Sequence, residues 1–129
     1  MSFLEMALDD VPELDAVAEG EYQLRIMSAE VKTSQKTGGN YLGVRLEVVD
    51  EVAKDINHVI MLPASTMSEK ETIIAKNRLK YFYDSFGIDY SAGSVNLETV
   101  VGLTGFALLT VEESDQYGRQ NRVKQFLGR

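Results

Sequence analysis

Residues 41–50 read YLGVRLEVVD and contain the clearest strand pattern of the chain. Leu42, Val44, Leu46 and Val48 alternate with polar or small residues. Successive side chains of a strand point to opposite faces, so one face of this strand is apolar and the other is open to solvent. The stretch therefore predicts an antiparallel sheet with its core on the side of these four residues.

A second strand precedes this one. In residues 20–33, GEYQLRIMSAEVKT, the alternation slips by one residue at Met27 and Ser28. Such a slip within a long strand is typical of a β-bulge. Residues 33–40, TSQKTGGN, are rich in small polar residues and glycine, which indicates a turn. The two strands are therefore expected to form a hairpin.

A third strand and a helix follow. Residues 56–63, INHVIMLP, predict a strand that Pro63 ends. Thr66 or Ser68, followed three residues later by Glu69 or Glu71, offers a capping box for a helix. The helix ends near Gly87, and its apolar stripe consists of Ala75, Leu79, Phe82 and Phe86.

Two strands close the chain, over residues 103–113 and 121–128, with a Tyr117-Gly118 turn between them. Three strands, a helix and a final hairpin follow one another in the order of the OB-fold. We therefore expect an all-β fold, a five-stranded β-barrel of the OB type with one main helix between strands three and four. A split α+β sheet shares this order and remains an alternative.

The chain is expected to have two parts, an acidic N-terminal arm over residues 1–19 and an OB-fold domain over residues 20–129. The first 20 residues hold six carboxylates and no Lys or Arg, whereas the rest of the chain holds 14 acidic and 13 basic residues. The net charge of -7 therefore belongs mainly to the arm. A nearly neutral domain can still present a cationic face to a polyanion.

Composition narrows the class of protein further. The chain has no cysteine, which excludes disulfides and thiolate metal sites. No apolar run approaches the roughly 18 to 20 residues that span a bilayer, and the acidic start resembles neither a signal nor a transit peptide. We expect a cytoplasmic protein without a membrane association.

The sequence contains no recognisable catalytic constellation. His58 is the only histidine, and neither a phosphate-binding loop nor a nucleophile elbow is present. The neighbouring pairs Asp50-Glu51 and Glu112-Glu113 would point to opposite faces of a strand. We expect a protein that is not an enzyme and that uses no cofactor or metal ion.

Single-stranded nucleic acid is bound by a cationic groove with flat side chains on which bases stack. In an OB-fold this groove lies on strands two and three, between the loops after strands one and four. Any of the candidates alone could be an ordinary solvated residue. The candidates that fall on this surface are Lys32, Lys36, Tyr41, Arg45, Tyr117, Arg119, Arg122 and Lys124.

Residues 20–50, the helix KNRLKYFYDSFGI and residues 97–127 resemble the phage-encoded OB-fold proteins of the single-stranded DNA-binding type. The resemblance implies protection of single strands in phage replication or recombination, in the cytoplasm of the host cell. Bacterial-type relatives end in an acidic tail, whereas here the acidic segment is at the other end. Carried over by position, the resemblance implies a groove of Lys36, Tyr41, Arg45, Tyr117, Arg119, Arg122 and Lys124.

Three functions follow as hypotheses. The first is largely sequence-independent binding of single-stranded DNA, with bases stacked on Tyr41 and Tyr117. The second is a protein-interaction module whose groove or acidic arm recruits a replication or recombination protein. The third is a structural protein that self-assembles, and a homo-oligomer is compatible with all three. The basic helical run of Lys76, Arg78 and Lys80 is either solvated or a docking site for the arm.

Overall fold

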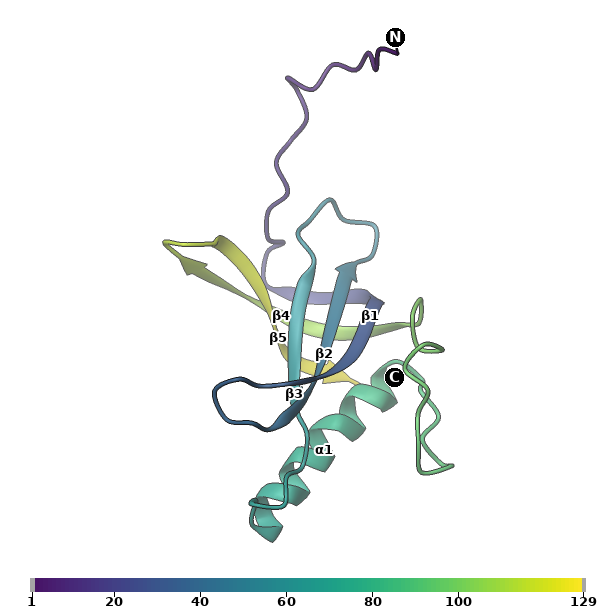
Figure 1. Ribbon diagram of the computed structural model, residues 1–129. Helices are drawn as coiled ribbons and strands as arrows, with labels where there is room; N and C mark the ends of the chain where they lie inside the picture. Colours follow the sequence, from purple (N-terminus) through teal and green to yellow (C-terminus); the bar gives the residue numbers. More distant parts are fainter. Residues whose placement is uncertain (1, 129) are drawn as a thin grey trace.

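The computed structural model describes residues 2–128, which form five strands and one main helix (Figure 1). The predicted element order is confirmed. In chain order the elements are β1 (Gly20–Thr33), β2 (Asn40–Val48), β3 (Ile56–Met61), α1 (Glu69–Ser85), β4 (Thr104–Ser114) and β5 (Gly118–Leu127).

All neighbouring strands are antiparallel, in the order β3-β2-β1-β4-β5. The long strand β1 lies at the centre because it pairs with β4 through its first half and with β2 along most of its length. The predicted bulge is confirmed. Ile26 pairs with Leu46 and Ser28 with Arg45, so Met27 has no residue opposite it. The extra residue lets β1 bend between the two halves of the sheet.

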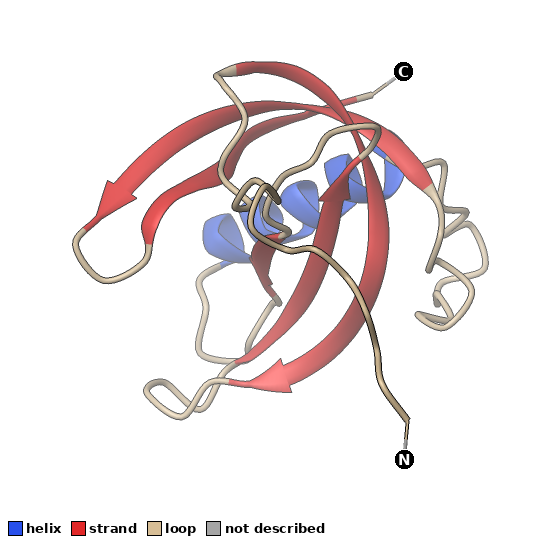
Figure 2. Ribbon diagram, turned by 90° about the horizontal axis from the view of Figure 1, so that it is seen from above, coloured by secondary structure: helices blue, strands red, loops and turns tan. Residues whose placement is uncertain are grey.

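The expected barrel is not closed. Strands β3 and β5 are the two edges of the sheet and are not hydrogen-bonded to each other (Figure 2). Two features oppose regular pairing of these edges. Strand β3 has only six residues, and Pro63 follows it without an N–H to donate. In β5, Lys124 is a bulged residue, because Leu108 pairs with Gln125 and Leu109 with Val123.

Helix α1 covers the open side of the sheet and packs against β3, β4 and β5. Phe82 and Phe86 are buried, and their ring centroids lie 5.4 and 5.9 Å from the ring centroid of Phe126 on β5. These aromatic contacts continue the core that the inner faces of the strands begin. The core of the sheet consists of Leu24, Ile26, Leu42, Val44, Leu46, Val48, Ile56, Ile60, Ala107 and Leu109.

The helix begins at the capping box that the sequence offered. Ser68 is the N-cap; its hydroxyl accepts a hydrogen bond from the Glu71 backbone N–H, and the Glu71 carboxylate accepts one from the Ser68 backbone N–H. The helix ends at Ser85, and Gly87 has φ 65°, the left-handed region that glycine adopts without strain. Within residues 2–128, no helix is long and apolar enough to cross a membrane.

The N-terminal arm has two parts. Residues 2–14 are exposed, whereas residues 15–18 lie along the domain. Asp15 forms a parallel bridge with Ala53, and Val17 and Asn121 exchange hydrogen bonds of 2.9 Å. Met1 and Arg129, the outermost residues of the expected arm and domain, lie outside the described residues. The arm is thus attached to β5 just before β1 begins.

Candidate functional site

The outer face of β1, β2 and β3 carries a small aromatic surface. Tyr41 on β2 pairs with Lys32 on β1 and with Met61 on β3, so the three side chains lie in one row across the sheet. In the next row Gly43 pairs with Glu30 and Val59. Val59 is 53% exposed. The rows together present apolar surface to solvent.

The Tyr41 ring packs beside Gly43. A Cβ atom built on Gly43 would lie 3.7 Å from the Tyr41 ring and 3.8 Å from the Lys32 side chain. The ring and the Lys32 stem therefore lie over Gly43 at van der Waals distance. The result is a flat patch with an aromatic face and an ammonium group beside it. We call Lys32, Tyr41 and Gly43 the β2 platform.

The loop of residues 34–39 continues from the β2 platform. The backbone of Ser34 donates to the carbonyl of Gly39, and Gly38 donates to the carbonyl of Ser34, both at 2.8 Å, so the loop is hydrogen-bonded within itself. It exposes Lys36. Within residues 2–128, neither Lys32 nor Lys36 has a carboxylate within ion-pair distance. Both lysines are therefore available to an anionic ligand.

Arg45 lies on the same face of β2 but has a protein partner. Its Nε atom is 3.3 Å from Asp55 Oδ2, and both side chains are about half exposed. Asp55 also lines a small pocket of about 260 Å³ between the starts of β3 and β5, together with Asn57, Tyr117 and Arg122. The Arg45–Asp55 pair thus connects the face of β2 with the β4–β5 hairpin.

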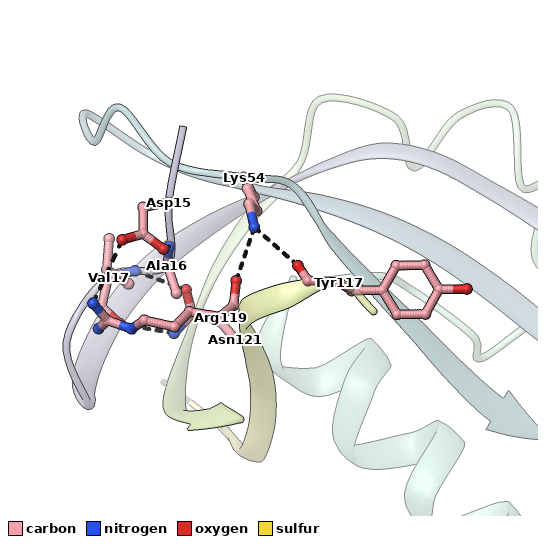
Figure 3. A network of polar contacts seen from close by, with 7 residues as sticks. All are labelled: Asp15, Ala16, Val17, Lys54, Tyr117, Arg119 and Asn121. Carbon is pink, nitrogen blue, oxygen red and sulfur yellow. Dashed lines mark hydrogen bonds and ion pairs between the residues drawn. The ribbon is translucent and has the colours of Figure 1, made fainter. Parts of the chain in front are cut away.

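The β4–β5 hairpin is fixed by Lys54, whose Nζ atom donates to the carbonyls of Tyr117 and Arg119 at 3.3 and 3.0 Å (Figure 3). The Tyr117 ring points away from this network and is 60% exposed. Arg119 points to the arm, where its Nη1 atom is 3.4 Å from Asp15 Oδ2. Tyr117 is therefore free to stack on a ligand, whereas Arg119 is occupied by the arm.

Asn121 is the centre of this attachment. It is only 6% exposed, and its side chain bonds both the N–H and the carbonyl of Val17 and the carbonyl of Thr110. A buried amide is stable only when its polar atoms have partners. Asn121 of β5 therefore holds the arm at residue 17, beside the backbone contacts that Asp15 makes with Ala53 and Lys54.

Arg122 and His58 lie near each other at the open side of the sheet. The Arg122 Nε atom is 2.8 Å from Glu112 Oε2. His58 packs edge-on against Phe126, with ring centroids 5.1 Å apart. Burial, and to a lesser degree the positive charge of Arg122, hold the pKa of His58 below its ordinary value. His58 is thus a partly buried residue at the edge of the core.

Lys124, the last candidate, lies elsewhere. It lines a groove of about 1020 Å³ between β3, α1 and β5, with Arg78, Tyr81 and Met61 among its neighbours. The groove occupies the gap that the unclosed barrel leaves. Lys124 is therefore separated from the hairpin residues that the sequence analysis grouped it with.

The structure places the eight candidates in three locations. Lys32, Lys36 and Tyr41 lie together at the β2 platform, and the loop after β1 and the β4–β5 hairpin project to the same side of the molecule in both views (Figures 1 and 2). Sequence reasoning missed Asn57, Val59 and Met61, which alternate in INHVIM and therefore share the outer face with Tyr41. Within residues 2–128, no cluster of three or more His, Asp or Glu side chains could hold a metal ion.

Comparison with known proteins gives one family. No curated protein matches the chain. A family model described as "Protein of unknown function (DUF669)" matches residues 5–102, which include most of the arm, strands β1 to β3 and helix α1. Because this match covers well over half of the chain, the protein belongs to the DUF669 family.

Proposed function

We propose that the protein binds single-stranded DNA, largely without sequence preference, through the β2 platform and the adjacent hairpin. The single observation that carries the proposal is the β2 platform itself. An aromatic ring on the outer face of the sheet packs beside a glycine and a lysine, and within residues 2–128 that lysine has no carboxylate partner. This combination suits a stacked base with its phosphate nearby.

The charged groups support a backbone-directed mode of binding. Lys32 and Lys36 can neutralise phosphates directly. Arg45, Arg119 and Arg122 would have to exchange the carboxylates of Asp55, Asp15 and Glu112 for phosphates. These pairs are exposed, so each is worth at most about 1 kcal/mol, and such an exchange costs little. Tyr117 supplies a second exposed ring on the same side of the molecule.

In this proposal the sheet is an unclosed variant of the OB-fold, with α1 between β3 and β4 as in that fold. The resemblance to phage single-stranded DNA-binding proteins supports a role in phage replication or recombination, in the cytoplasm of the host. The role is binding, with no catalytic step and no cofactor.

The test is a fluorescence-anisotropy titration of a labelled oligo-dT, beside a duplex of equal length, at low and then moderate salt. We expect tight binding of the single strand, weak binding of the duplex and an affinity that falls steeply with salt. An absence of binding to the single strand at low salt would refute the proposal. Equal binding of strand and duplex would indicate charge attraction alone and would remove the stacking role of Tyr41.

A protein-interaction module is the second candidate, and one observation favours it. The arm exposes large apolar side chains, with Phe3 and Leu4 more than three quarters exposed. A segment with several exposed apolar side chains is suited to an interaction with a partner that covers them. A replication or recombination protein captured by the arm, without any affinity for nucleic acid, would support this candidate over the first.

A further inference from the structure

The groove between β3, α1 and β5 has a surface that suits an extended peptide. Its two long sides are the edge strands of the sheet, which can accept an added strand. Its lining includes Val59 and Met61 of β3, whose side chains lie on the outer face with Tyr41, and Tyr81 of α1, which is 65% exposed. An apolar groove flanked by free strand edges is a typical peptide-binding site.

The groove also has a charge preference. Arg78 on α1 and Lys124 on β5 line it, and within residues 2–128 neither has a carboxylate within ion-pair distance. Among the described residues, Asp84 is the only acidic one in the lining, and it accepts a hydrogen bond of 2.8 Å from the Tyr90 hydroxyl. The groove therefore favours an apolar peptide that carries negative charges.

The chain itself contains such a peptide. Residues 2–14 carry Glu5, Asp9, Asp10 and Glu13 and no Lys or Arg. The same segment exposes six large apolar side chains, which are Phe3, Leu4, Met6, Leu8, Val11 and Leu14. It has no helix or strand of its own, and Pro12 is compatible with an added edge strand. Its apolar side chains match the apolar lining of the groove, and its carboxylates match the basic residues there.

We infer that residues 2–14 of one copy occupy the groove of a second copy. The arm leaves the domain at residues 15–18, which Asn121 and Ala53 hold, and it runs away from α1 (Figure 1). A segment that is anchored in this way and directed away from its own groove is suited to reach a neighbour. Exchange of arms between two copies would cover both grooves and give a closed dimer.

The experiment is sedimentation velocity of the full chain without nucleic acid, over a wide range of concentration. Four proteins are compared: the wild type, a groove variant (Arg78→Glu with Lys124→Glu), an arm variant (Asp9→Lys with Asp10→Lys) and the combination of all four changes. We expect concentration-dependent association of the wild type. Each variant should need about tenfold more protein to associate, because opposite charges become like charges. The combination should restore association, since the charges are again complementary.

Lys70→Glu is the control, because it reverses one charge, half the change of the groove variant, at an exposed helical position outside the groove lining. It should leave the association unchanged. If a reversal variant melts early by circular dichroism, Arg78→Gln with Lys124→Gln replaces it and should weaken association in the same direction. A wild type that sediments as a monomer at every concentration overturns the inference, and so does a combination variant that fails to restore association. The experiment contains no DNA, so its result is independent of the proposed function.

Discussion

The two ends of the proposed DNA-binding surface contain the same residue types but differ in what surrounds them. At the β2 platform and the adjacent 34–39 loop, Lys32 and Lys36 have no carboxylate partner among the described residues, and the Tyr41 ring packs beside Gly43. At the β4–β5 hairpin, Arg119 and Arg122 are paired with Asp15 and Glu112. A basic residue contributes to ligand binding only to the extent that it is not already paired. The platform should therefore bind DNA directly, and the hairpin should bind after an exchange of partners.

Tyr41→Ala should produce the largest effect, because it removes the platform's only ring. If a base stacks there, the affinity for oligo-dT falls by about 1–3 kcal/mol. Tyr41→Phe is the matched control and should retain nearly all the affinity, since stacking needs the ring and not the hydroxyl. Anisotropy titration at one salt concentration measures both. A loss below a few tenths of a kcal/mol for Tyr41→Ala would exclude Tyr41 from the site.

Asn121→Ala should have an effect of similar size on the free energy of unfolding. It leaves the N–H and carbonyl of Val17 without their side-chain partners, which costs about 1–3 kcal/mol. Urea denaturation measures this loss. Hydrogen exchange should report faster exchange at Val17 than in the wild type. Unchanged exchange there would show that the bridge between Asp15 and Ala53 holds the arm without Asn121.

Lys32→Gln and Arg122→Gln compare an unpaired lysine of the platform with a paired arginine of the hairpin. If Lys32 contacts one phosphate of a single strand, its loss reduces the slope of log K against log salt by about 0.7. The change at Arg122 should reduce the slope less, because the arginine must first leave Glu112. The measurement is an anisotropy titration at four or more salt concentrations. Equal changes of slope would show that the ion pairs of the hairpin do not restrict its arginines.

Glu112→Gln should raise the affinity for oligo-dT instead of lowering it, and its effect should be smaller. It frees Arg122, so oligo-dT affinity at low salt should rise by a few-fold, in line with the modest energy of an exposed ion pair. Glu98→Gln is the matched control, because it removes one negative charge from an exposed position in the 88–103 loop. A similar gain in both variants would mean that net charge, and not the release of Arg122, determines the affinity.

The elements of the fold could be predicted from sequence because they depend on local patterns. Alternation predicted β2, the phase slip at Met27 predicted the bulge, and Ser68 with Glu71 predicted the helix start. The open barrel could not be predicted, because closure depends on the meeting of two edges that are far apart in the chain. The ion pairs of Arg119 and Arg122 could not be predicted either, in part for the same reason. Asp15 is 104 residues from Arg119, and only the fold brings them together.

Replacement of His58 should have the smallest effect, and the effect should be on the stability of the fold and not on DNA binding. Its pKa is lowered in the folded chain, first by burial and then by Arg122. The unfolded chain has the ordinary value of about 6.5. As the pH falls from 7.5 through 6.5, the unfolded state therefore takes up a proton before the folded state does, and stability decreases. This decrease continues until the pH reaches the lowered pKa of the folded chain.

His58→Gln cannot take up this proton, so its melting temperature should fall less between pH 7.5 and pH 5.5 than that of the wild type. Carboxylates contribute equally to both proteins, so the difference between the two profiles isolates His58. Arg122→Gln retains the buried imidazole but removes the nearby positive charge, and it should show an intermediate profile. Parallel profiles for the wild type and His58→Gln would mean that the imidazole titrates normally in the folded chain. In that case the groove beside Phe126 would admit water to His58, and the packing between β3 and β5 would be looser than their ring contact indicates.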